Sequence, residues 1–222
     1  MHAGMFRAHG SPILYIRVLK ALAEMRCRRS SLANVRAALC GFAYGLFGKG
    51  IAMRISVDLE NGLLPDRYGK YAPIEYQLEG HPIRSFPIGI EGVPAGARSL
   101  ALTFLDWDAI PVGGFCWIHW IACNFPPETR LIPENASAAG AIPCVQGSNS
   151  DFSPFAGGHT NPALIHRYVG PQPPDKTHDY TLTLYALDCK LDLADGYYLN
   201  EFRRAIRGHV LAEASLDLPS RA

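Results

Sequence analysis

One run of apolar residues constrains the fold of this chain more than any other feature. Residues 115 to 125 are almost uninterruptedly apolar, include Trp117 and Trp120, and contain a single histidine, His119. The run is too short for a membrane-spanning helix, which needs about 18 residues or more. Its length and composition are those of a central strand that is covered on both faces. We therefore expect the chain to fold around a buried β-sheet.

Further strands are expected on either side of this run. Residues 99 to 105 have the length and branching of a strand, and residues 53 to 57 open with a strand-like alternation. Residues 180 to 185 alternate strictly, so Tyr180 and Tyr185 should point to opposite faces of the sheet. With 21 glycines and 17 prolines between such segments, the pattern predicts a mainly β, antiparallel domain.

Helical spacing occurs only near the C-terminus, where a C-terminal helix is predicted. The apolar positions of that helix are Leu199, Phe202, Ile206 and Val210. Three loops rich in proline and glycine separate the strands, at residues 86 to 97, 106 to 114 and 126 to 177. The longest of them exceeds the usual length of a structureless loop, so we expect it to contain short elements and to carry function.

The formal net charge of +1 conceals an uneven distribution. Residues 1 to 52 carry eight basic residues and one acidic residue, whereas residues 53 to 222 carry 13 basic and 19 acidic residues. The two segments therefore have net charges of +7 and −6. A difference this large predicts a boundary at Met53, with a basic extension over 1–52 and one domain over 53–222.

Three interpretations of the extension stay open. The first is an overextended reading frame, with Met53 as the true start. The second is a signal peptide within residues 25 to 52, with an arginine-rich start and an apolar stretch at 37 to 47, which would export the protein. The third is a functional arm, since residues 13 to 25 have the spacing of a basic amphipathic helix.

Composition excludes several classes of protein. The chain is 48% hydrophobic and 18% charged, which is too apolar for intrinsic disorder. The acidic main segment argues against a nucleic-acid partner, and no apolar stretch is long enough for an integral membrane segment. The six cysteines form no Cys-x-x-Cys pair and fit free thiols in a reducing compartment, so a cytoplasmic location is expected.

Three segments concentrate polar side chains of the kind found in binding sites. Asp106 and Asp108 follow the end of a predicted strand, and His119 interrupts the apolar run. A stiff, proline-rich loop then leads into a strand that carries His178 and Tyr180, which are two apart and so share a face. If that face meets His119, two imidazoles, a phenol and a carboxylate surround one cavity suited to a small anion.

These segments resemble the signature blocks of the phosphatidylethanolamine-binding protein (PEBP) family. The blocks are Asp-x-Asp-Ala from Asp106, His-Trp-x-x-x-Asn from His119, and Gly-Pro-x-Pro-Pro from Gly170 followed by His-x-Tyr from His178. The closer likeness is to the bacterial Raf-kinase-inhibitor-like branch, and it covers about residues 53 to 217. Two departures concern the pocket rim, because Trp107 replaces a usual proline and Ile110 displaces a second proline to Pro111.

The resemblance implies a β-sandwich of Greek-key type with a small anion pocket near one end. By motif match, Trp107, Gly170 and Pro171 would form the pocket rim, and Asp108 would support its loop. The ligand-binding residues that it implies are Asp106, Asp108, His119, Pro174, His178 and Tyr180. Members of the family bind phosphate, phosphorylethanolamine or other oxyanions, several act on protein partners such as kinases or proteases, and bacterial relatives make a homodimer plausible by analogy.

The residues favour a binding protein over an enzyme. The sequence contains no Gly-x-Ser-x-Gly elbow, P-loop, His-Glu-x-x-His or Gly-x-Gly-x-x-Gly motif, so neither a catalytic residue nor a cofactor is predicted. Histidines 119, 159, 166 and 178 lack a compact metal spacing, and no metal site is predicted. We expect a non-catalytic protein that binds a phosphate-like anion or phospholipid headgroup; the alternative is a regulatory inhibitor of a kinase or protease that acts through protein–protein contacts.

Overall fold

The computed structural model describes residues 52–222, and the elements below belong to that part of the chain. The interpretations of the N-terminal extension concern residues 1–51, which lie outside the described residues, and they stay predictions. The strands are β1 (Arg54–Ser56), β2 (Gln77–Leu78), β3 (His81–Pro82), β4 (Ile88–Glu91), β5 (Ser99–Asp106), β6 (Trp117–Phe125), β7 (Leu131–Ile132), β8 (Val145–Gln146), β9 (His178–Leu187) and β10 (Val210–Ser220). The helices are η1 (Asp66–Tyr68), η2 (Ile74–Tyr76), α3 (Ile110–Gly113), α4 (Ala136–Ala139), η3 (Ser150–Phe152), α5 (Pro162–Ile165) and α6 (Leu199–Ala205).

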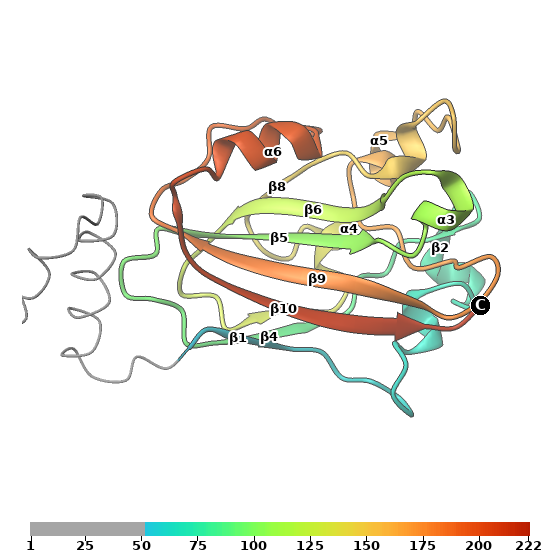
Figure 1. Cartoon of the computed structure of the whole chain (residues 1–222), viewed down its shortest axis with the longest axis horizontal. Coiled ribbons are helices and arrows are strands. Elements are labelled where there is room, and N and C mark those ends of the chain that lie inside the picture. The colour runs from blue at the N-terminus through green and yellow to red at the C-terminus, as the bar shows by residue number, and fades with distance from the viewer. Residues whose placement is uncertain (1–51) are drawn as a thin grey trace, which may run out of the picture. The chain divides into compact units, whose positions relative to one another are not determined.

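The larger sheet contains the strands that the sequence predicts most strongly. Its order is β10-β9-β5-β6-β8, with antiparallel pairing throughout. After the long connection, β9 returns to lie beside β5, and this pairing sets Asp106 opposite Tyr180 at the ends of the two strands. The strands run side by side along the length of the domain (Figure 1). The predicted antiparallel, Greek-key arrangement is therefore confirmed.

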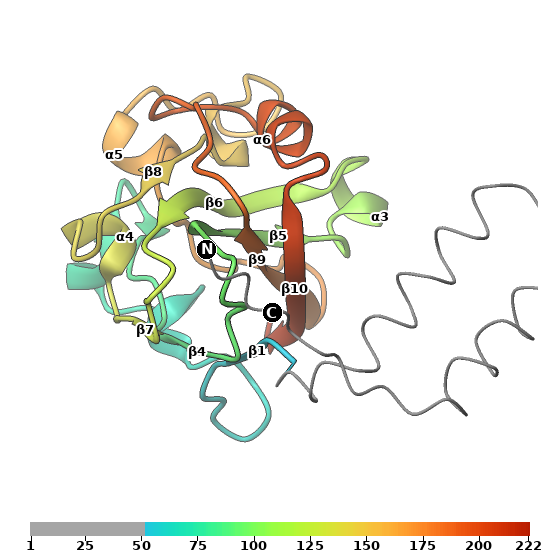
Figure 2. The same ribbon diagram turned by 90° about the vertical axis from the view of Figure 1, so that its left-hand side faces the viewer.

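A smaller sheet completes the sandwich. Its order is β1-β4-β7, and it lies below the larger sheet in Figure 2. The main hydrophobic core lies between the sheets, where even-numbered side chains such as Leu102 and Phe104 of β5 meet Ile88 and Ile90 of β4. These side chains are almost completely buried, and burying a leucine, isoleucine or phenylalanine contributes about 1.5–3 kcal/mol each.

A second core lies on the opposite face of the larger sheet. Odd-numbered residues, among them Ala101 and Ile121, pack there against Phe202 of α6. The central strands are thus covered on both faces, as the apolar run predicts. Tyr180 belongs to the main core and Tyr185 packs against the second one, so the prediction that they face opposite sides is confirmed.

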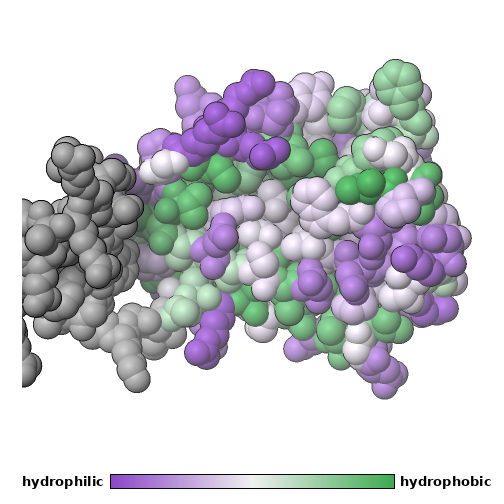
Figure 3. All heavy atoms as spheres, viewed as in Figure 1, coloured by the Kyte–Doolittle hydropathy of each residue, from purple (hydrophilic) through white to green (hydrophobic). Residues whose placement is uncertain are grey.

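The C-terminal helix is present as α6, but its predicted extent was wrong. The apolar spacing continues to Val210, whereas the helix ends at Ala205 and Val210 begins strand β10. Gly208 lies between them with a φ of 80°, a left-handed conformation that terminates a helix and turns the chain into the strand. Hydrophilic side chains gather over α6 on the outer surface (Figure 3).

The long connection contains short elements, as expected. Between residues 126 and 177 the chain forms β7, α4, β8, η3 and α5. Among the helices of residues 52–222, none has the length and apolar character needed to cross a membrane.

Candidate functional site

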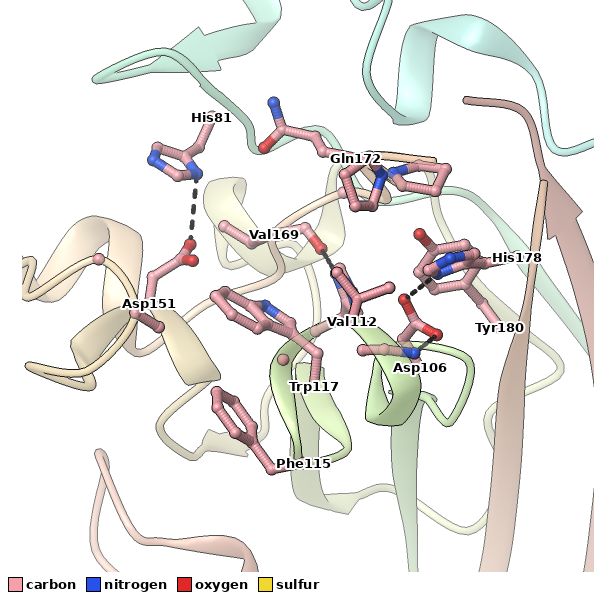
Figure 4. A pocket seen from close by; sticks show the side chains of 18 residues that line it. His81, Asp106, Val112, Phe115, Trp117, Asp151, Val169, Gln172, His178 and Tyr180 are labelled. Atoms are coloured by element: carbon pink, nitrogen blue, oxygen red, sulfur yellow. Dashed lines mark hydrogen bonds and ion pairs between the residues drawn. The ribbon is translucent and has the colours of Figure 1, made fainter. Parts of the chain in front are cut away.

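A cavity of about 310 Å³ lies at one end of the larger sheet. The ends of β5, β6 and β9 contribute Asp106, His119, His178 and Tyr180 to its lining. Apolar walls come from the loops and from α3, and they include Val112, Phe115, Trp117, Val169, Pro173 and Pro174. In Figure 4, Asp106, His178 and Tyr180 lie at one side of the cavity, and His81 and Asp151 lie at the other. The cavity is thus apolar in the middle, with a polar group at each end.

His178 lies between two carboxylates. Its Nδ1 donates to Asp106 Oδ2 at 2.8 Å, and its Nε2 donates to Asp175 Oδ1 at 2.9 Å. Burial opposes the charged form of His178, but the hydrogen bonds to Asp106 and Asp175 outweigh it and raise the pKa of the imidazole. Because a carboxylate faces each ring nitrogen, the imidazolium is the form that satisfies both contacts. This end of the cavity therefore holds one buried positive charge.

The two carboxylates beside His178 differ in their surroundings. Asp106 is buried, and its second oxygen accepts a hydrogen bond from the backbone N–H of Ala109 at 3.0 Å. The Asp175 side chain is 51% exposed, whereas that of His178 is 1% exposed. The hydrogen bond from His178 lowers the pKa of Asp175. Asp106 is thus a fixed partner of His178, and Asp175 is a partner that solvent or a ligand can replace.

His119 has a different chemical state from His178. Its Nδ1 donates to the backbone carbonyl of Val169 at 2.9 Å. Burial lowers the pKa of His119 to about 4, so the ring is neutral at pH 7. A neutral ring with its proton on Nδ1 offers Nε2 as a hydrogen-bond acceptor. The sequence did not distinguish the two histidines; in the structure one supplies a charge and the other an acceptor.

Tyr180 supplies a neutral donor at the same end of the cavity. Its ring is buried and meets the His119 ring edge to face, with the ring centres 5.0 Å apart. Burial and the nearby Asp106 carboxylate raise the pKa of Tyr180, so its hydroxyl keeps its proton. Four side chains therefore form one buried cluster: the Tyr180 donor, the His119 acceptor, the His178 cation and the Asp106 carboxylate.

The remaining predicted residues lie around this cluster. Pro174 and Gly170 line the cavity, whereas Pro171 is buried beside the lining. Asp108 accepts a hydrogen bond from the backbone N–H of Asp179 at 3.0 Å and so fastens the β5 loop to β9. Trp107 is exposed and does not line the cavity, because α3 turns the chain so that Val112, not Trp107, faces it.

Two residues of the His-Trp-x-x-x-Asn block stabilise the fold and do not contribute to the cavity. Trp120 Nε1 donates to the buried Gln146 Oε1 at 2.8 Å and ties β6 to β8. Asn124 has a left-handed φ of 64°, and its side chain both donates to the carbonyl of Leu191 and accepts from the Leu191 N–H. Of this block, only His119 reaches the cavity.

Three polar lining residues were missed from the sequence. Gln172 lies inside the predicted Gly-Pro-x-Pro-Pro block, whereas His81 comes from β3 and Asp151 from η3, both far along the chain from the predicted blocks. Nothing in the spacing of His81 or Asp151 pointed to a site, because long-range packing alone brings them to the cavity. Trp117, which forms part of the aromatic wall, lies within the predicted central strand and is the first residue of β6.

Comparison with known proteins agrees with this geometry. The family model described as "Phosphatidylethanolamine-binding protein" matches residues 56–220. The chain is similar to YxkA of Bacillus subtilis, which is described as an uncharacterized protein, with 52% identity over 161 residues. That match covers 72% of this chain and 95% of YxkA. A UPF0098 protein of Methanothermobacter thermautotrophicus is 40% identical, over 65% of this chain and 86% of its own length.

A solved structure extends the likeness to the fold. A PEBP homologue from Chlamydia trachomatis matches with a TM-score of 0.61 and 28% identity, over 77% of this chain and 98% of its own. The family match, residues 56–220, includes the whole larger sheet together with Asp106, His119, His178 and Tyr180. On the family match and these relatives, the chain belongs to the phosphatidylethanolamine-binding protein family.

Proposed function

We infer that the protein is a non-catalytic binding protein whose pocket takes a phosphate-like headgroup, such as phosphate or phosphorylethanolamine. The observation that carries this proposal is the position of His178, with one ring nitrogen against the buried Asp106 and the other against the exposed Asp175. Asp175 Oδ1 marks the position at which His178 Nε2 donates a hydrogen bond to a carboxylate oxygen. A ligand oxyanion that displaces Asp175 would form the same charge-assisted hydrogen bond with His178 Nε2.

The rest of the cluster suits a zwitterionic headgroup. The Tyr180 hydroxyl offers a second donor to an oxyanion, while His119 Nε2 and the Asp106 carboxylate offer acceptors to an ammonium group. The apolar walls at Val112, Phe115 and Trp117 suit the carbon atoms that join the two charged ends. Phosphorylethanolamine carries all three chemical features.

The state of the histidines supports binding over catalysis. A general base works best with a pKa near the operating pH. The pKa of His119 is about 4, and both nitrogens of His178 are engaged by carboxylates. The surroundings of both rings therefore hold their protons in place, which suits a binding site.

Calorimetric titration of the full chain with phosphate and phosphorylethanolamine tests the proposal. Replacing Asp175 by alanine should tighten binding about two- to fivefold, because the ligand no longer displaces an exposed, weakly held carboxylate. Replacing His178 by glutamine should weaken binding roughly 10- to 100-fold through loss of the charged donor.

The Asp188–His209 pair provides a matched control. Asp188 Oδ1 lies 2.8 Å from His209 Nδ1, both side chains are about half exposed, and neither residue lines the cavity. Asp188→Ala should leave both affinities unchanged. An absence of binding at millimolar ligand, or an Asp175→Ala variant that binds like Asp188→Ala, would contradict the proposal.

A surface beside the cavity favours a second candidate, a regulator that inhibits a kinase or protease through contact. Four exposed apolar side chains occur within nine residues around α3, and Figure 3 shows hydrophobic residues on the surface there. They are Trp107, Ile110, Val112 and Phe115. Exposed apolar clusters of this kind are typical of interaction sites. Because Val112 and Phe115 also line the cavity, a bound ligand would alter the surface that a partner contacts.

Affinity capture from cell lysate tests this second candidate. The protein should retain a kinase or protease, and phosphorylethanolamine should change the amount retained. Trp107→Ser with Ile110→Ser should abolish capture, whereas Ile74→Ser, at an exposed apolar residue outside the cavity lining, should not. Retention of a second copy of this chain alone would indicate a homodimer, and equal capture by both variants would exclude the α3 surface.

A further inference from the structure

A line of four titratable side chains connects the second end of the cavity with the surface. Asp151 Oδ2 lies 3.4 Å from His81 Nδ1, and His81 Nε2 lies 3.1 Å from His159 Nε2. His159 Nδ1 in turn lies 3.2 Å from Glu79 Oε2. Each imidazole therefore faces a carboxylate with its Nδ1 atom and faces the other imidazole with its Nε2 atom. Figure 4 shows the inner part of this line, His81 and Asp151, at the cavity wall.

With both imidazoles neutral, this line of four side chains is one hydrogen short. Each of the three contacts joins two atoms with lone pairs, so each needs one hydrogen between them, and two neutral imidazoles supply only two. If His81 gives its N–H to His159, its bare Nδ1 faces Asp151. His81 Nδ1 and Asp151 Oδ2 lie 3.4 Å apart, and both are buried without a hydrogen-bond partner among residues 52–222. A cation between the two Nε2 atoms removes the shortage, because both N–H groups then lie on Nδ1, the side of each ring that faces a carboxylate.

The positions of the rings fit a shared ion. The ring centres of His81 and His159 are 4.7 Å apart. A straight N–H···N hydrogen bond at the observed nitrogen distance would separate them by roughly 5.4 Å. Two imidazoles that bind one ion at about 2.05 Å from each Nε2 would have their centres roughly 4.8 Å apart, with an N–metal–N angle of roughly 98°. The observed spacing is shorter than that of a straight hydrogen bond and close to that of the second arrangement.

The hairpin that carries this line uses an unfavourable residue. Glu79 and Gly80 form the two-residue turn between β2 and β3, and both have positive φ, 52° and 83°. Such a turn prefers asparagine, aspartate or glycine at its first position, and a glutamate in the left-handed region costs about 1–2 kcal/mol. What the glutamate gains is contact with His159 and with Asn161 Nδ2, which lies 2.7 Å from Glu79 Oε1. Local strain of this kind concentrates at functional sites.

The backbone at Gly157 packs closely against the imidazole pair. A Cβ atom at Gly157 would lie 2.6 Å from His159 Cδ2 and 3.2 Å from His159 Nε2. Any side chain at this position would crowd the nitrogen that faces His81. Only glycine therefore fits against the edge of His159, and Gly157 also belongs to the cavity lining.

We propose that His81 and His159 bind a divalent transition-metal ion such as Zn²⁺ through their Nε2 atoms, with Asp151 and Glu79 as positioning residues behind the two rings. Imidazole is a preferred ligand of zinc, copper and nickel. Carboxylates that accept the other N–H of a metal-binding histidine fix its tautomer and strengthen its binding. Two protein ligands leave the remaining coordination positions to water or to a donor group of a molecule in the cavity.

Titration with zinc ions tests this site. The measurement uses the full chain in a Cys189→Ser, His209→Gln background, because ligand atoms of Asp188, Cys189 and His209 lie within 4.8 Å of one another and offer a competing site. His159→Gln should remove one zinc equivalent or weaken it at least tenfold. Glu79→Asn should weaken the same equivalent about tenfold, while raising the melting temperature because asparagine suits the turn.

Ring-nitrogen NMR and a control histidine make the outcome specific. Zinc should shift the Nε2 resonances of His81 and His159 together. His166→Gln is the matched control, since His166 lies outside the line, and it should bind like the background. Zinc binding that is the same in His159→Gln and His166→Gln, or zinc shifts absent from the two Nε2 resonances, would overturn the proposal.

Discussion

Replacing Asp106 by alanine is expected to lower the free energy of unfolding by about 3–5 kcal/mol, the usual cost of removing one partner of a buried ion pair. The carboxylate is 4% exposed and accepts hydrogen bonds from both His178 Nδ1 and the Ala109 N–H. The substitution leaves the buried imidazole without its fixed counter-charge and a backbone donor without its acceptor. Urea denaturation at pH 6 measures the loss.

Asp175→Ala is the control, because it removes the other carboxylate from the same histidine. The Asp175 side chain is half exposed, and exposed ion pairs contribute about 0–1 kcal/mol. Equal losses in the two variants would contradict the assignment of Asp106 as the fixed partner.

The same pair makes stability depend on pH, which gives a second readout of the Asp106 prediction. The pKa of folded His178 is raised, so its contribution is complete below the unfolded value of about 6.5 and is lost as the pH rises through the folded value. The wild-type protein should therefore lose stability between pH 6 and alkaline pH. In Asp106→Asn this loss should be smaller. Of the two hydrogen bonds that raise the pKa of His178, the one with the greater effect then has a neutral acceptor in place of a carboxylate. An unchanged pH profile would contradict the interpretation.

Replacing Asn124 by alanine is expected to lower the free energy of unfolding by about 3–4 kcal/mol. Two hydrogen bonds to Leu191, at 2.9 and 2.8 Å, are lost at about 1 kcal/mol each. Alanine must also adopt the left-handed φ of 64° at a cost of about 1–2 kcal/mol. Thermal and urea denaturation measure the change.

Asn124→Gly separates the two contributions. Glycine adopts positive φ freely, so this variant should lose the hydrogen bonds alone and be about 1 kcal/mol more stable than Asn124→Ala. Affinity for phosphate should stay unchanged in both, since Asn124 does not line the cavity. Equal stability of the two variants would show that backbone conformation at this residue contributes nothing.

The strands of the larger sheet were predictable because their signals are local. The apolar run at 115–125 became β6, and the alternation at 180–185 became the centre of β9. Alternation also placed His178 and Tyr180 on one face, and both line the cavity. The meeting of that face with Asp106 and His119 followed from the strand pairing, and the family likeness identified the same residues.

The rest of the site depends on contacts that no local pattern encodes. The end of α6 was misplaced because Ile206 and Val210 continue a helical spacing across Gly208, where the chain changes direction. His81 and His159 are 78 residues apart, and nothing in either neighbourhood predicts that their Nε2 atoms meet. The charge states of His119 and His178 likewise follow from burial and hydrogen bonding, and both became visible only in three dimensions.

Strand β10 has a consequence for the order in which the protein matures. It pairs with β9 along its whole length, as far as Ser220 opposite His178. Domains begin to fold while the ribosome is still extending the chain. Until β10 has been synthesised, the strand that carries His178 and Tyr180 is an unprotected sheet edge, the kind that invites aggregation. Binding competence should therefore arise only after translation has passed residue 220, and a nascent chain stalled before β10 would depend on chaperones.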